Sequence, residues 1–205
     1  MLPDLAHMTI ITAVKKNQKI AIACDTLASS TNGGLHTPAE YLAAPIKLLT
    51  SGNSIFGVAG SFAVRQIFID LLQREEPVNL KTREDIFRWL LSHQESLKTD
   101  YFMKTDNGND KKQPAQSQWL SSLVINPHGI FFISAYREVT EYTKFWAIGS
   151  GNRFALGALE ALYDQDLSAE EIATQAARVA TKFSPSCAEP IMVQSMDLSG
   201  GFAAS

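Results

Sequence analysis

The sequence is poor in the features that mark several classes of protein. It contains only two cysteines in 205 residues, Cys24 and Cys187, too few for a disulfide framework. We therefore expect reduced thiols in a cytoplasmic protein, and a bridge between them is the less favoured alternative. The formal net charge is only -3, without the basic excess of a nucleic-acid-binding protein. No stretch reaches the roughly 18 apolar residues of a membrane span.

Signals for metals and cofactors are also scarce. The four histidines are scattered along the chain, and none lies at metal-ligand spacing from another histidine or a cysteine. Ser150 lies between Gly149 and Gly151, but this triplet fits neither a G-x-S-x-G nucleophile elbow nor a phosphate-binding loop. We therefore expect no metal and no cofactor.

The hydrophobic pattern is that of an α+β protein. Strands are predicted at 9–14, 19–23, 46–49, 54–59, 119–125, 130–135, 137–143, 145–148 and 190–198, and helices at 61–76, 82–97, 153–163 and 168–182. This block order favours two antiparallel sheets stacked face to face, with pairs of helices outside them. Residues 9–198 read as one domain, and residues 199–205 as a loose tail.

Thr9 stands out because it opens the first predicted strand directly after Met8. A threonine at a free N-terminus combines a nucleophilic hydroxyl with an amine that can accept its proton. Removal of Met8 would expose Thr9 if translation starts there, whereas a start at Met1 requires cleavage of an eight-residue propeptide. The alternative is an ordinary strand threonine, and the pattern alone favours that alternative.

Other residues supply a chemical context for Thr9. Lys47 lies in an otherwise apolar strand, where its charge is costly unless it is paired, and Asp25 ends the second strand of the first hairpin. A cation near Thr9 would favour a neutral amine and stabilise an alkoxide. Lys47 could instead extend its ammonium into water from an edge strand. Gly60 lies at a strand-to-helix junction that offers either oxyanion donors or merely a tight turn.

Five motifs in one register connect these residues to a known family. They are Thr9-Ile-Ile-Thr, Ile20-Ala-Ile-Ala-Cys-Asp-Thr, Ile46-Lys47, Val58-Ala-Gly-Ser and Ala147-Ile-Gly-Ser-Gly. Together they resemble proteasome β-subunits and the bacterial protease HslV. The stretch 126–151 also resembles the small bacterial proteasome homologue group called BPH. The resemblance implies an N-terminal-nucleophile hydrolase with a four-layer αββα sandwich.

The resemblance also implies a role for each catalytic position. Thr9 would be the nucleophile and, through its amine, the base. Asp25 and Lys47 would hold and polarise it. The Gly60 N–H would line the oxyanion hole, and Ser150 would position the amine and a water. The family often has an acidic residue near the end of the last long helix, but here residues 182–187 read Lys-Phe-Ser-Pro-Ser-Cys.

The implied activity is that of a threonine endopeptidase acting on peptides or unfolded proteins inside a self-assembled ring. Val58, and less strongly Ala28, would line the pocket for the side chain before the cut. The sequence does not indicate whether an ATP-dependent unfoldase serves the ring. Two alternatives remain open: a catalytically inert ring subunit, and an N-terminal-nucleophile amidohydrolase that acts on small amides.

Overall fold

The computed structural model describes residues 9–29, 36–43, 47–74, 79–103 and 120–198. The predicted propeptide and the predicted tail lie outside these ranges. The strands are β1 (Ile10–Lys16), β2 (Lys19–Asp25), β3 (Ala28–Ser29), β4 (His36–Thr37), β5 (Leu48–Ser51), β6 (Ser54–Gly60), β7 (Leu120–Asn126), β8 (Gly129–Ile133), β9 (Val139–Tyr142), β10 (Phe145–Gly149) and β11 (Ile191–Asp197). The helices are α1 (Phe62–Arg74), α2 (Arg83–Ser92), α3 (Gln94–Thr99), α4 (Asn152–Tyr163) and α5 (Ala169–Phe183), with a short 3₁₀ turn η1 (Ala39–Tyr41).

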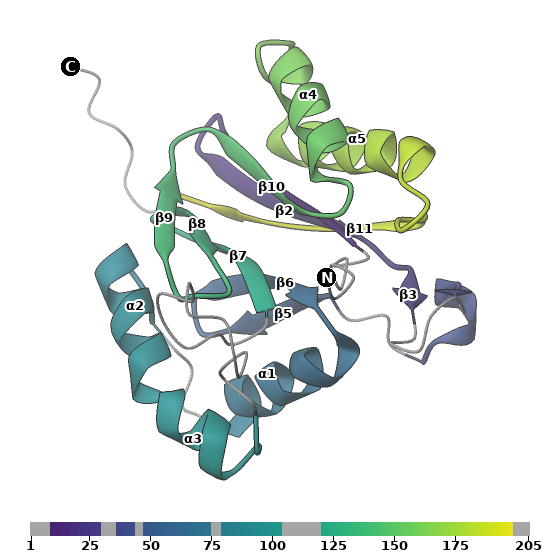
Figure 1. The fold of residues 1–205 in the computed structure, drawn as a ribbon. Coiled ribbons are helices and arrows are strands. Elements are labelled where there is room, and N and C mark those ends of the chain that lie inside the picture. Colours follow the sequence, from purple (N-terminus) through teal and green to yellow (C-terminus); the bar gives the residue numbers. More distant parts are fainter. Residues whose placement is uncertain (1–8, 30–35, 44–46, 75–78, 104–119, 199–205) are drawn as a thin grey trace, which may run out of the picture.

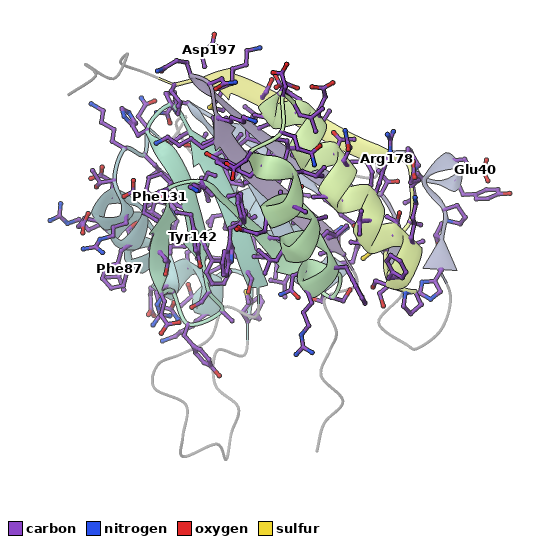
Figure 2. All side chains as sticks on the ribbon, turned by 90° about the horizontal axis from the view of Figure 1, so that it is seen from above. Glu40, Phe87, Phe131, Tyr142, Arg178 and Asp197 are labelled. Carbon is purple, nitrogen blue, oxygen red and sulfur yellow. The ribbon has the colours of Figure 1, made fainter. Side chains whose placement is uncertain are left out.

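Two antiparallel sheets form the centre of the molecule. One has the strand order β10-β1-β2-β11 and the other β5-β6-β7-β8-β9. Figure 1 shows α4 and α5 on the outer face of the first sheet, and α1 and α2 on the outer face of the second. Figure 2 places Arg178 of α5 and Phe87 of α2 on opposite sides of the molecule. The predicted αββα sandwich is thereby confirmed.

Strand β1 shows how the alternation of side chains builds the layers. Ile10 and Val14 pack toward the helix pair α4 and α5, whereas Ile11 and Ala13 pack between the two sheets. All four are completely buried. Burial of an isoleucine side chain stabilises the fold by roughly 1.5–3 kcal/mol. This alternation fixes the register of β1 and therefore the place where the strand begins, just after Thr9.

Two helices begin at N-cap residues, and one predicted helix is divided into two. Thr82 and Ser168 each form a capping box with the third residue of the helix that follows. The helix predicted from Thr82 to Leu97 is instead divided at His93 into α2 and α3. Nδ1 of His93 lies 2.6 Å from the carbonyl oxygen of Trp89, the acceptor that the helix would otherwise offer to the His93 N–H.

Three short elements, β3, β4 and η1, were not predicted from the sequence.

Both cysteines are free thiols, as expected. Among the described residues, no helix is both long enough and apolar enough to cross a membrane.

Candidate active site

Thr9 lies directly before β1 at one end of the sandwich and is 1% exposed. Its hydroxyl Oγ1 donates a hydrogen bond of 2.8 Å to Oδ1 of Asp25. Its carbonyl oxygen accepts a bond of 3.4 Å from Oγ of Ser150. Gly149 has a φ of +100°, and a Cβ atom at that position would collide with the Thr9 carbonyl. The glycine therefore allows β10 to pass close beside Thr9.

Asp25 is the centre of the site. It is completely buried, and its carboxylate accepts five hydrogen bonds. Oδ1 receives bonds from the Thr9 hydroxyl, the Ile10 amide and the Lys47 ammonium, and Oδ2 receives the amides of Leu27 and Ala188. These donors satisfy both oxygens of a buried carboxylate. The position follows from the hairpin, because Ile11 on β1 pairs with Cys24 on β2.

Lys47 completes a three-residue cluster with Thr9 and Asp25. Its Nζ lies 2.6 Å from Oδ1 of Asp25, and its side chain is 2% exposed. Burial lowers the pKa of Lys47, and the attraction of Asp25 opposes that shift. Lys47 lies one residue before β5, where its carbonyl oxygen accepts a 2.9 Å hydrogen bond from the amide of Val58. The predicted alternative, an edge lysine with its ammonium in water, is wrong.

The hydroxyl of Ser150 contacts both Thr9 and Cys187. The Ser150 hydroxyl is 3.9 Å from Sγ of Cys187, and that thiol donates to Oγ of Ser184 at 3.5 Å. Burial raises the pKa of Cys187. No motif indicated that Cys187 would lie here, because its part of the chain comes after α5. The last residue of α5 is Phe183, which is 64% exposed, and not the acidic residue that the family often has near the end of this helix.

The other three predicted site residues, Gly60, Ala28 and Val58, lie outside the cluster of Thr9, Asp25 and Lys47. Gly60 ends β6, just before Ser61 and α1, and is partly buried. Ala28 lies in β3 and is also partly buried. Val58 is completely buried in the cluster between β6 and the helices α1 and α2. Its role in the substrate pocket stays a prediction.

This geometry suits a hydroxyl that must become an alkoxide. A buried ammonium and a threonine hydroxyl share one carboxylate oxygen, which holds the hydroxyl and places a positive charge close to it. In the described part of the chain, no three His, Cys, Asp or Glu side chains gather as a metal site would require.

Comparisons with known proteins agree with this fold. The solved structure of BPH from Thiobacillus denitrificans has a TM-score of 0.84 and 33% identity, over 94% of this chain and 100% of that one. The same protein in complex with epoxomicin has a TM-score of 0.85, over 93% of this chain and 100% of that one. The chain belongs to the family of proteasome-like N-terminal-nucleophile hydrolases.

Two other members of this family are more distant. The ATP-dependent protease subunit HslV of Caulobacter sp. (strain K31) is 29% identical over 182 residues, covering 86% of this chain and 87% of the relative. HslV from Trypanosoma brucei has a TM-score of 0.61 at 20% identity and shares the fold. No family model matches the chain.

Proposed function

We propose that the protein is a threonine endopeptidase in which Thr9 is the N-terminal residue and the nucleophile. The observation that carries this proposal is the buried cluster of Thr9, Asp25 and Lys47, joined at 2.8 and 2.6 Å through one carboxylate oxygen. Such a cluster is costly to bury, so it is weak evidence for a role in stability alone, whereas N-terminal threonine chemistry uses all three groups.

The reaction requires that residues 1–8 be removed, because only then does Thr9 carry a free α-amine. This amine has a pKa near 8 in model peptides, so a sizeable fraction is neutral near pH 7.5. Oγ1 attacks the scissile carbonyl carbon, and the hydroxyl proton moves to the neutral amine. The Lys47 ammonium stabilises the negative charge on Oγ1 during this step.

Two further steps complete the cycle. The tetrahedral intermediate carries its negative charge on the former carbonyl oxygen, where the Gly60 N–H is our proposed donor. The C–N bond then breaks, and the leaving amine takes the proton from the Thr9 ammonium. Water hydrolyses the resulting ester, with the Thr9 amine as base, and frees the hydroxyl. In this scheme Ser150, which already donates to the Thr9 carbonyl, positions the amine and the attacking water.

We also propose that the subunits assemble into a ring that encloses the active sites, in the cytoplasm, and that peptides or unfolded proteins are the substrates. The support is the similarity to HslV and BPH over most of the chain. The partly buried Ala28 is our proposed contact for the substrate side chain.

The test is peptide turnover by three forms of the protein. We expect wild type to cleave fluorogenic peptides and to be inhibited by epoxomicin, the ligand named for the similar structure. Thr9→Ser keeps a hydroxyl and an amine and should retain part of this activity. Thr9→Ala should assemble to the same size by sedimentation and show no turnover.

Equal turnover by wild type and Thr9→Ala would refute the mechanism. Hydrolysis of small acyl-amides without cleavage of any peptide would identify an amidohydrolase instead. A wild-type ring with Thr9 exposed and no turnover of either substrate class would identify an inert subunit.

A further inference from the structure

Arg65 is a buried cation with an unsatisfied hydrogen-bond donor. It lies in the first turns of α1 and is 7% exposed. Its Nε atom is shielded from solvent and has no hydrogen-bond partner among the described residues. No carboxylate in the described part of the chain forms an ion pair with it, and its guanidinium lies 5.9 Å from the ring centre of Phe62. Because a buried charge that has lost its hydration is costly, a partner is expected to come from elsewhere.

The location of Arg65 on α1 is close to the active-site end of the sandwich. Arg65, Phe68 and Leu72 follow one another at helical spacing on one face of α1, and Phe68 and Leu72 pack against β6 beside Val58. Arg65 therefore occupies the end of this sheet-facing stripe that is nearest to Gly60. Figure 1 shows that β6 leads into α1 at the same end of the sandwich at which β2 ends, and Asp25 is the last residue of β2.

The charges of the neighbouring groups agree with this placement. Burial lowers the pKa of Arg65, and the carboxylate of Asp25 opposes that shift. Arg65 in turn lowers the pKa of Lys47, as a second cation would, in addition to the larger effects of burial and of Asp25. The three side chains thus interact through a region of low dielectric.

Among the described residues, the balance of charge in this region is positive. Asp25 is the one described carboxylate that influences the pKa of both buried cations, and its oxygens already accept five donors, none of them from Arg65. The guanidinium of arginine matches a carboxylate with two parallel N–H···O bonds. An acidic group brought by a ligand would satisfy Arg65 and neutralise the excess charge.

We propose that Arg65 determines specificity by binding an acidic side chain of the substrate next to the peptide bond that Thr9 cleaves. The inference rests on the proposed peptidase function. The scissile carbonyl must touch both Thr9 and the Gly60 N–H, so the adjacent side chain of the peptide faces the junction between β6 and α1. Arg65 lies five residues after Gly60, on the face of α1 turned toward the sheet.

The experiment compares three peptides that differ only in the residue before the cleaved bond, which is Glu, Gln or Leu. Glu and Gln have the same shape, so their ratio isolates the charge. We expect wild type to cleave the Glu peptide with a kcat/KM at least about tenfold above that of the Gln peptide, the order expected for a buried charge pair. This preference should fall below about pH 4.3, where the peptide glutamate takes up a proton.

Variants of two arginines on the same helix provide the matched comparison. Arg65→Met keeps the length of the side chain, and we expect the Glu-to-Gln ratio to drop to about one. Arg74→Met removes an exposed arginine from the far end of α1, where it pairs with Asp70, and should leave the ratio unchanged. If Arg65→Met does not fold, Arg65→Lys keeps the charge but not the two-pronged donor and should show an intermediate ratio.

The outcomes separate this inference from the proposed function. Cleavage of the Glu and Gln peptides at equal rates by wild type would overturn the role of Arg65 and leave the peptidase intact. An equal loss on all three peptides in Arg65→Met would also overturn it, because that result indicates a purely electrostatic effect on Lys47. Failure of wild type to cleave any peptide would overturn the peptidase and this inference together.

Discussion

Replacement of Asp25 by asparagine should be among the most damaging single substitutions of similar size in this protein. The carboxylate is completely buried and accepts donors on both oxygens. In Asp25→Asn, one oxygen becomes an NH₂ group, which can donate but not accept. If the remaining oxygen keeps Thr9 and Lys47, the new NH₂ group faces the amides of Leu27 and Ala188, which are also donors.

The magnitude follows from these contacts. Removing one partner of a buried ion pair costs about 3–5 kcal/mol, because the other charge remains buried. Each amide left without an acceptor adds about 1–3 kcal/mol, although a small shift of the loop would let water relieve part of this. We take about 3–5 kcal/mol as the expected loss. For a chain of this length, that lowers the thermal midpoint by roughly 6–20 °C.

The assay is thermal unfolding at one fixed subunit concentration, so that assembly contributes equally to every variant. Asp166→Asn is the matched control, because Asp166 is exposed and the same change should move the midpoint by less than about 2 °C. The double variant Asp25→Asn, Lys47→Met removes the unpaired charge and should recover part of the loss. A midpoint for Asp25→Asn within about 2 °C of wild type, equivalent to roughly 1 kcal/mol or less, would refute the reasoning.

Two further predictions concern packing and pH. A Cβ atom on Gly57 would lie 2.6 Å from Cγ2 of Ile11 between the two sheets. Gly57→Ala should therefore lower the free energy of unfolding in urea by about 1–3 kcal/mol. Gly157→Ala, on the open face of α4, should raise it by up to about 1 kcal/mol. Equal midpoints for the two variants would contradict this packing. Burial raises the pKa of Cys24 to about 12 from a usual 9.0, so the stability that its thiol contributes is present below pH 9 and is lost as the pH rises toward 12. Between pH 8 and pH 10, wild type should lose about 1.4 kcal/mol more unfolding free energy than Cys24→Ala, and parallel pH curves for the two would contradict the shift.

The sequence was a good guide to the layers of the fold because their signals are local. The alternation in β1 and the helical spacing in α5 depend on neighbouring residues, and both elements were predicted with nearly correct bounds. The division at His93 was missed, because it depends on a side chain competing for one backbone carbonyl rather than on a periodic pattern.

The site could be predicted only in part. Lys47 gave a signal, since a charge in an apolar strand calls for a partner, and Asp25 was the partner at hand. The donors from Leu27 and Ala188 left no trace in the sequence, because backbone amides do not depend on residue type. The pocket role of Val58 came from the resemblance alone, and its place on the helix-facing side of β6 is decided by the sheet register. Arg65 was missed because one arginine in an amphipathic helix is normally exposed.

The most direct test of the central claim is the intact mass of the purified native protein together with its N-terminal sequence. The account predicts a chain that begins at Thr9, with a free amine beside the hydroxyl that is bonded to Asp25. A protein that assembles fully and cleaves peptides while still beginning at Met1 or Met8 would contradict it, because the amine that must accept the proton would then be part of a peptide bond.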